Sequence, residues 1–201
     1  MASKIDVFNM ALFHIGSSSK VASDTEASME RIACSTFYDT TLDALLAYKS
    51  TDWGFALKSV VLADLGEPPT NWQFRYAYPN DCVRAIGLVI PGNRTPSEAE
   101  QIPYQLQQGD NGQTLVTDQP EAELQYISRG LPAERFPAAF IEALALRLAA
   151  FIAMPLKKDA GLAGDLAERA ELAIQSAMAN SLNQRQPDAE PVSDYIQEMH
   201  A

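Results

Sequence analysis

Residues 136–156 read FPAAFIEALALRLAAFIAMPL and contain only two charged residues, Glu142 and Arg147. Almost every other position is Ala, Leu, Ile or Phe, whereas a surface helix carries polar residues over a broad face. The sequence therefore predicts a helix that is buried on most sides, with alanines that allow neighbouring helices to approach closely. Pro137 suits the first helical turn, and Pro155 is expected to end the helix.

A membrane-spanning helix is the alternative interpretation of this stretch, because its length suffices to cross a bilayer. Two charges lie near its middle, no group of basic residues precedes it, and the rest of the chain is polar. These features argue against a membrane span. We therefore expect the core helix of a soluble protein, around which the other elements gather.

The composition bounds the class of protein. The chain has 201 residues, enough for one domain or for one core with an inserted unit, and a net charge of −11. This charge argues against a general nucleic-acid-binding surface, which needs clustered Lys and Arg. It is compatible with a surface that DNA slides past. Cys34 and Cys82 match no metal or redox spacing and are expected to be free thiols in a cytoplasm. The first residues lack the pattern of a signal peptide.

A first helix is expected over residues 3–15. Ser3 is a suitable N-cap, and Asp6 lies in the first turn, where the helix dipole favours a negative charge. Apolar residues follow at helical spacing, and Gly16 is a suitable C-terminal stop. His14 lies near this apolar stripe and is interpreted as a packed or capping histidine rather than a catalytic base.

Two further helices are expected, one before and one after the central stretch. The earlier one begins after Ser23 or Asp24 and continues to about Lys49, and residues 160–180 form the later one. Apolar residues of the earlier helix are expected on one side, facing the core: Met29, Ile32, Ala33, Phe37, Ala44, Leu45 and Tyr48.

The middle of the chain, residues 53–129, has the two-residue periodicity of strands. Residues 55–65 fit a strand or a short helix, and Val60 and Val61 favour the strand. Asn111 followed by Gly112 predicts the tight turn of a hairpin. The other expected strands cover residues 72–78, 82–90, 104–108, 113–117 and 124–128. Together they predict a small antiparallel β unit.

Four aromatic residues, Trp53, Trp72, Tyr76 and Tyr78, are the candidate packing or interface positions of the β unit. Aromatic side chains can stack on nucleic-acid bases, but that use needs a basic groove, which the sequence does not suggest. Packing is therefore the expectation. Asp81 and Arg84 flank the aromatic strand and are expected to form an ion pair.

The last residues, 183–201, read NQRQPDAEPVSDYIQEMHA and are polar and rich in proline and acid. Such a segment buries too little apolar surface to order itself alone. It contains one apolar group, Val192, Tyr195, Ile196 and Met199. The segment is either a frayed end or a tail that folds onto a partner through these four residues.

Motifs of catalytic or cofactor sites are not found in the sequence. It lacks HExxH, paired cysteines, a Gly-rich phosphate loop and GxSxG. We therefore expect no enzymatic activity, no cofactor and no metal ion.

The order of the segments resembles the head–tail connector (adaptor) proteins of tailed bacteriophages, the family that includes tail tubular protein A. The resemblance covers residues 4–182. Its most distinctive part is W-x-F-A at 53–56, followed by W-x-x-x-Y-x-Y-P-x-D-C-x-R at 72–84. The other segments that carry it are DVFNMALFHIGS, TDWGFALKSVVLADL, NWQFRYAYPNDCVRAIGLV, YQLQQGDNGQTLVTD and LQYISRGLPAERFPAAFIEALALRLAAFIAMPL. Gly54, Val60 and Val61 depart from it, because relatives tend to be more polar there.

The resemblance implies one connector domain, residues 1–182, in which helices within 3–50 and 136–182 flank the β unit. It implies a ring of twelve subunits beneath the portal protein of the filled head. Such a ring extends the DNA channel and forms a platform for the downstream tail or nozzle protein, while double-stranded DNA passes without specific binding. The protein would be located at the neck of the virion after assembly in the host cytoplasm, with no membrane partner. The apolar residues of the tail would then contact a neighbouring subunit or the portal.

The expected fold class is α+β: mainly an α-helical bundle with an inserted small antiparallel β unit and an extended C-terminal tail. A structural connector is the leading functional hypothesis. One alternative is a small-molecule or peptide binding module whose pocket lies between the β unit and the helices and uses Trp72, Tyr76 and Tyr78. Another is a hydrolase with an unrecognised site. In a connector, Glu142 and Arg147 are expected to mark the part of the central helix that its own subunit does not bury.

Overall fold

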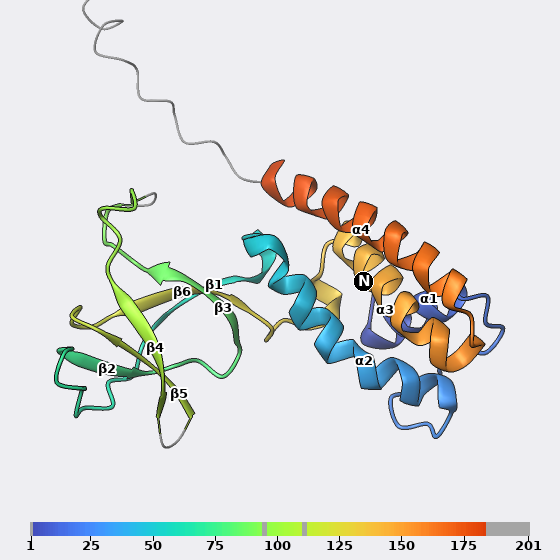
Figure 1. The fold of residues 1–201 in the computed structure, drawn as a ribbon, viewed down its shortest axis with the longest axis horizontal. Coiled ribbons are helices and arrows are strands. Elements are labelled where there is room, and N and C mark those ends of the chain that lie inside the picture. The colour runs from blue at the N-terminus through green and yellow to red at the C-terminus, as the bar shows by residue number, and fades with distance from the viewer. Residues whose placement is uncertain (1, 94–95, 110–111, 184–201) are drawn as a thin grey trace, which may run out of the picture.

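The computed structural model describes residues 2–93, 96–109 and 112–183, which form a helical bundle and a β unit lying side by side (Figure 1). The helices are α1 (Lys4–His14), α2 (Met29–Leu46), α3 (Ala138–Lys157) and α4 (Ala160–Asn183), with short 3-10 helices η1 (Tyr48–Ser50), η2 (Gly54–Ala56) and η3 (Ala133–Arg135). The strands are β1 (Leu57–Val61), β2 (Phe74–Ala77), β3 (Cys82–Leu88), β4 (Tyr104–Gly109), β5 (Gly112–Thr117) and β6 (Glu123–Ser128). The predicted α+β class, with a β unit inserted between helices, is confirmed.

Helix α3 lies at the centre of the bundle and contacts α1, α2 and α4. Side chains along most of its length are buried, among them Phe140, Leu144, Leu148 and Ile152. Helix α4 runs along α3 and has the most extensive contact with it (Figure 1). Alanines such as the buried Ala149 allow this close approach. The predicted buried helix is therefore confirmed.

By length and composition, α3 could also cross a membrane. In its most apolar window, however, 56% of the residues are buried inside the protein, as in the core helix of a soluble domain.

The end of α3 differs from the prediction. Pro155 lies inside the helix, which continues to Lys157 and ends at Lys158 in the left-handed conformation, with φ +56°. Proline removes one N–H donor, and the carbonyl that loses its bond is that of Phe151, four residues earlier. Phe151 and Pro155 are both exposed, so water can reach this region of the last turns. Water can therefore take the place of the lost donor at the Phe151 carbonyl.

Helix α1 begins as the sequence predicts. The Ser3 hydroxyl accepts a hydrogen bond from the Asp6 N–H at 3.2 Å, and the Asp6 carboxylate accepts one from the Ser3 N–H at 2.8 Å. This reciprocal capping box satisfies donors that the first helical turn leaves free. After α1, Gly16 takes a φ of +66°, which glycine adopts without steric cost.

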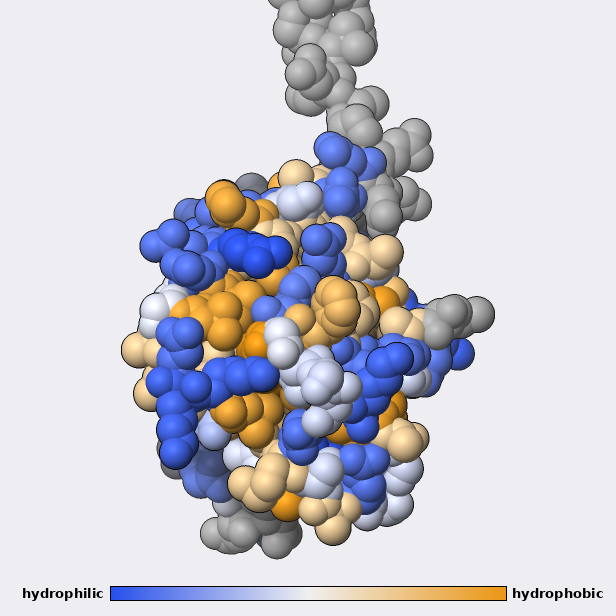
Figure 2. All heavy atoms as spheres, turned by 90° about the vertical axis from the view of Figure 1, so that its right-hand side faces the viewer, coloured by the Kyte–Doolittle hydropathy of each residue, from blue (hydrophilic) through white to orange (hydrophobic). Residues whose placement is uncertain are grey.

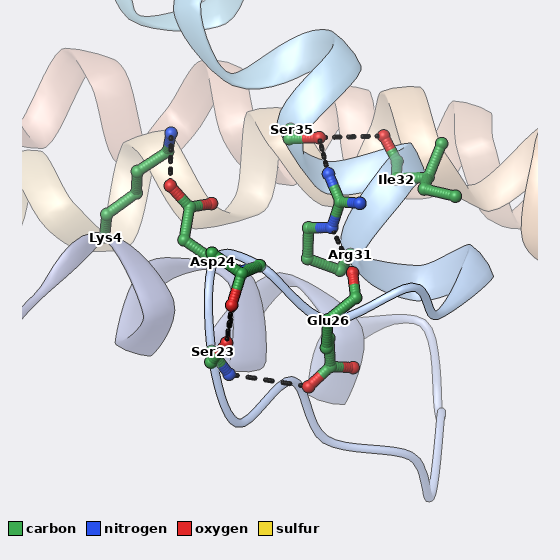
Figure 3. A network of polar contacts seen from close by, with 8 residues as sticks. Lys4, Ser23, Asp24, Glu26, Arg31, Ile32 and Ser35 are labelled. Carbon is green, nitrogen blue, oxygen red and sulfur yellow. Dashed lines mark hydrogen bonds and ion pairs between the residues drawn. The ribbon is translucent and has the colours of Figure 1, made fainter.

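Helix α2 begins later than predicted, at Met29 with Ser28 as its N-cap. The residues before it form a polar loop in which Glu26 contacts Ser23, while the Arg31 Nε donates to the Glu26 carbonyl at 2.7 Å (Figure 3). These local bonds compete with helical hydrogen bonds, which explains the delayed start. Asn9 holds the same loop on α1, because its side-chain amide forms two hydrogen bonds with the Val21 backbone.

The β unit consists of two antiparallel three-stranded sheets, which we call the inner sheet (β1-β6-β3) and the outer sheet (β2-β5-β4). One face of the inner sheet packs against the helical core through Ile127, with Val83 and Ile86 beside it. The opposite face packs with the outer sheet in a second core. That core is formed by Leu62, Tyr76, Cys82, Leu88, Leu115, Ala122, Leu124 and Tyr126. The inner sheet therefore joins the two halves of the fold.

The predicted strands are confirmed with altered bounds: β1, β2 and β3 are shorter than predicted, and β4, β5 and β6 are each one residue longer. The preference for a strand within residues 55–65 is confirmed by β1, and the predicted hairpin by the pairing of β4 with β5. The strand expected over residues 72–78 is limited to β2, which Trp72 precedes. Asn111 lies outside the described residues.

Asp81 links three strands of the β unit, and the predicted Asp81–Arg84 ion pair is wrong. Its carboxylate accepts hydrogen bonds from the Lys58 Nζ at 2.9 Å, the Tyr126 hydroxyl at 2.9 Å and the Ser128 hydroxyl at 2.8 Å. The strand has a β-bulge between Cys82 and Arg84, which shifts the register of the residues that follow it. Arg84 forms its ion pair with Asp52 instead. Burial raises the pKa of Asp81, but these three donors outweigh burial and lower the pKa to about 2.

We expect Asp81→Asn to lower the free energy of unfolding at neutral pH by about 1–2 kcal/mol, since it removes a charge held by three donors. Because the folded pKa lies below the unfolded value of 3.8, the wild-type contribution is present above about pH 4 and is lost as the pH falls towards 2. Urea unfolding of both proteins across this range measures the difference. Asp165→Asn, at an exposed position of α4, is the control and should change stability little. Parallel pH profiles for wild type and Asp81→Asn would contradict this role.

Candidate assembly surfaces

The four predicted aromatic positions are mainly packing residues in the structure. Trp53 is buried in the helical core rather than in the β unit, and its Nε1 donates to the Leu45 carbonyl at 3.1 Å. Tyr76 is buried in the second core, and its hydroxyl donates to the Gln119 carbonyl at 2.9 Å. Trp72 and Tyr78 are half-buried. These residues therefore do not come together as one exposed surface. Val192, Tyr195, Ile196 and Met199, predicted to contact a partner, lie outside the described residues.

The cysteine and histidine side chains of the described residues, Cys34, Cys82 and His14, show no sign of activation. Burial raises the pKa of the Cys34 thiol to about 12 and also raises that of Cys82. A reactive cysteine needs a lowered pKa, so neither thiol has the character of a nucleophile. Burial, assisted by Arg169, lowers the pKa of His14. Within residues 2–93, 96–109 and 112–183, no group of three His, Cys, Asp or Glu residues is arranged to hold a metal ion.

Two arginine–aspartate pairs join the bundle to the inner sheet. The Arg84 guanidinium on β3 donates to the Asp52 carboxylate and to the Thr51 carbonyl, the latter at 3.0 Å. Arg129, after β6, lies 3.0 Å from the Asp43 carboxylate on α2. No local pattern in the sequence indicates these partners, which lie more than thirty residues away from Arg84 and more than eighty from Arg129. The pairs help to fix the orientation of the β unit on the bundle.

Arg147, predicted to face away from its own subunit, instead contacts residues of its own chain. Its guanidinium carbon lies 5.9 Å from the centroid of the Tyr48 ring. The Tyr48 hydroxyl donates to the Glu171 carboxylate, which also pairs with the Lys49 Nζ at 3.4 Å. This cluster joins η1, α3 and α4. Glu142, in contrast, is exposed as predicted.

The end of the bundle away from the β unit exposes large apolar side chains from three helices. They are Phe13 of α1, Met29 and Ile32 of α2, and Phe151 and Met154 of α3, with exposed fractions of 80%, 68%, 42%, 46% and 49%. We call these five residues the bundle-end surface. The prediction that Met29, Ile32 and Ala44 face the core is wrong, because all three are exposed and the core side of α2 is formed by Cys34, Tyr38 and Leu45. Figure 2 shows this end, where apolar areas lie between polar ones.

Contacts between helices hold the bundle-end surface in place. The ring of Phe151 stacks on that of Phe37 of α2, with centroids 5.8 Å apart and planes 12° from parallel. The Lys157 Nζ donates to the Gly16 carbonyl at 3.1 Å, which keeps the ends of α3 and α1 together. Met154 lies one turn after Phe151 on the same side of α3. The exposed apolar side chains therefore belong to helices that are packed together, and not to a loop.

An open groove of about 890 Å³ lies on the inner sheet, beside the part of its face that the bundle covers. Its lining mixes apolar and polar groups. The residues from the sheet and the adjoining loops include Asp52, Leu57, Ser59, Ile86, Ile90, Ile102, Tyr104, Glu123 and Gln125. Trp72, Tyr76 and Tyr78, which the binding-module hypothesis used, line neither this groove nor the small cavity beside Trp53. The groove depends on strand order, which no local motif of the sequence indicates.

Comparison of the chain with known proteins gives no identification. No protein-family model matches it, and a search of curated proteins finds no significantly similar sequence.

Proposed function

We propose that this protein is a structural head–tail connector of a tailed bacteriophage. Copies of the chain form a ring of twelve under the portal protein, extend the DNA channel and provide a platform for the downstream tail or nozzle protein. The protein acts at the neck of the virion by assembly, without catalysis, cofactor or membrane partner. The resemblance of residues 4–182 to connector proteins supports this proposal, as does a fold in which helices flank a β unit.

The observation that carries the proposal is the bundle-end surface. Exposed apolar side chains from three helices lie at this end of the bundle. Single exposed apolar residues are ordinary on soluble proteins, but a group rimmed by polar residues is typical of an interaction site. We assign this end of the bundle to contacts with the portal or with the neighbouring subunit of the ring.

The charge of the protein fits passage of DNA through the ring. With a net charge of −11, the chain offers few cations to bind phosphates. Basic residues of the described chain are also partly neutralised, as in the Arg84–Asp52, Arg129–Asp43 and Lys58–Asp81 pairs. A channel of such subunits would let the phosphate backbone pass without being held.

Native mass spectrometry tests the proposal. The protein is mixed with portal rings encoded in the same genome, and the mass of the complex is measured against that of the portal alone. We expect a discrete complex with twelve added copies, even where the free protein is a monomer. Portal rings that gain no mass at saturating protein would overturn the connector function.

The groove on the inner sheet favours the second candidate, a small-molecule or peptide binding module. Its volume falls in the range of ligand pockets, and its lining combines apolar walls with a few polar groups. Saturable binding of a small molecule, together with no association with portal rings, would favour this candidate over the connector.

A further inference from the structure

The groove occupies the part of the inner sheet that the bundle leaves uncovered. On β6, Glu123, Gln125 and Ile127 share one face, because successive side chains of a strand alternate. Ile127 packs into the helical core, whereas Gln125 and Glu123 line the groove. Leu57 supplies an apolar wall and is 37% exposed. A face of the inner sheet with both apolar and polar side chains is therefore open to solvent within the described chain.

The C-terminal end of α4 lies beside the start of this groove. Asn180 and Ser181, in its last turn, line a small cavity together with Trp53 and Phe55. Two residues after Phe55, Leu57 begins β1 and lines the groove. The chain that follows α4 therefore starts next to the open face of the inner sheet.

The segment that follows α4 has the sequence of a groove-binding helix. Val192, Tyr195, Ile196 and Met199 stand at positions i, i+3, i+4 and i+7, which places them on one face of a helix. This spacing is the anchor pattern of amphipathic helices that bind apolar grooves. Pro191 precedes them and suits a first helical turn. A helix of about nine residues is marginal in isolation, so it needs a surface to form on.

The length of the chain between α4 and the anchors favours the groove over the bundle-end surface as their contact within one chain. Residues 184–191 separate α4 from the first anchor and span at most about 25–30 Å when fully extended. The groove begins beside the end of α4, within that reach. The bundle-end surface lies towards the other end of α4 (Figure 1). Since α4 has 24 residues, it is about 36 Å long, so the far end of the bundle is more distant from the anchors than the groove is.

We propose that residues 191–199 dock as an amphipathic helix in the groove of their own chain. The four anchors face Leu57, Ile86 and Ile102, and the acidic residues of the segment, Asp194 and Glu198, face solvent. Docking covers the open face of the inner sheet and supplies the partner that the segment lacks in isolation. This inference does not rest on the connector function.

Hydrogen exchange of the full-length chain, followed by mass spectrometry, tests the docking. We expect Ile196→Asp to accelerate exchange at residues 57–61 and 86–90 by about tenfold, because the undocked sheet face is open to water. Gln197→Asp adds the same charge at the neighbouring polar position and should leave exchange unchanged. Exchange in α3 reports that both variants remain folded, since neither substitution touches the described core.

The dependence on protein concentration separates docking within one chain from docking between copies. Protection of residues 57–61 that stays constant over about a hundredfold dilution supports docking within the chain. Protection that falls on dilution would assign the groove to the tail of a second copy and overturn the proposal. Equal exchange in wild type and Ile196→Asp would show that the segment does not bind the groove.

Discussion

Replacing Phe140 by alanine is expected to lower the free energy of unfolding by about 3–5 kcal/mol, a large share of the stability of a typical domain. Phe140 is 1% exposed, and its ring centroid lies 5.0 Å from that of Trp53, 4.8 Å from Phe55 and 5.2 Å from Phe136. These neighbours come from the two connections between the bundle and the β unit. Truncation leaves a cavity where both halves of the fold meet, so both cores should lose stability together.

Thermal or urea unfolding measures this effect, and for a chain of this size it corresponds to a fall in Tm of roughly 10 °C. Phe13→Ala is the matched control, because Phe13 is 80% exposed in the same bundle. It should change stability by less than about 0.5 kcal/mol. Similar losses for the two variants would show that the aromatic group around Phe140 is not the stabilising junction.

The second large effect is expected at the bundle-end surface. The double substitution Phe151→Glu with Met154→Glu should weaken association with portal rings by about 30-fold or more, the equivalent of about 2 kcal/mol at an interface hot spot. Carboxylates placed at these positions would lose their hydration in an apolar interface. Both residues are about half exposed, so the folded subunit should tolerate the change. Titration of portal rings with the labelled variant measures the affinity.

Leu172→Glu with Leu182→Glu is the control for this prediction. It adds the same charge at exposed apolar positions of α4, 68% and 56% accessible, outside the bundle-end surface. We expect near wild-type affinity from it. If both double variants bind portal rings equally well, the bundle-end surface is not the contact. Unfolding curves of both variants verify that the subunits remain folded.

Local features of the fold were predictable from the sequence, because they depend on residues close in the chain. The capping box at Ser3 follows from residue types three positions apart, and the β4–β5 hairpin from its turn residues. The burial of α3 follows from its lack of a polar face. Boundaries were less accurate where side chains compete with the backbone, as in the loop before α2.

The remaining features depend on contacts between distant residues. Strand β6 lies between β1 and β3, so no adjacent pair in the inner sheet is joined by a short turn. That order decides where the groove lies and why Asp81 meets Lys58 rather than Arg84. The exposure of Met29 and Ile32 follows from their positions in the helix rather than from their apolar character. At the helical period Met29 lies about 165° and Ile32 about 135° from the centre of the core side of α2, so both side chains are directed away from the core.

Electron microscopy of the protein mixed with portal-bearing heads tests the connector function most directly. We predict a closed ring of twelve copies on each portal, coaxial with it, around an open channel wide enough for double-stranded DNA. Helices of neighbouring subunits or of the portal should cover the bundle-end surface in this ring. Heads whose portals carry no added density at saturating protein would contradict the account.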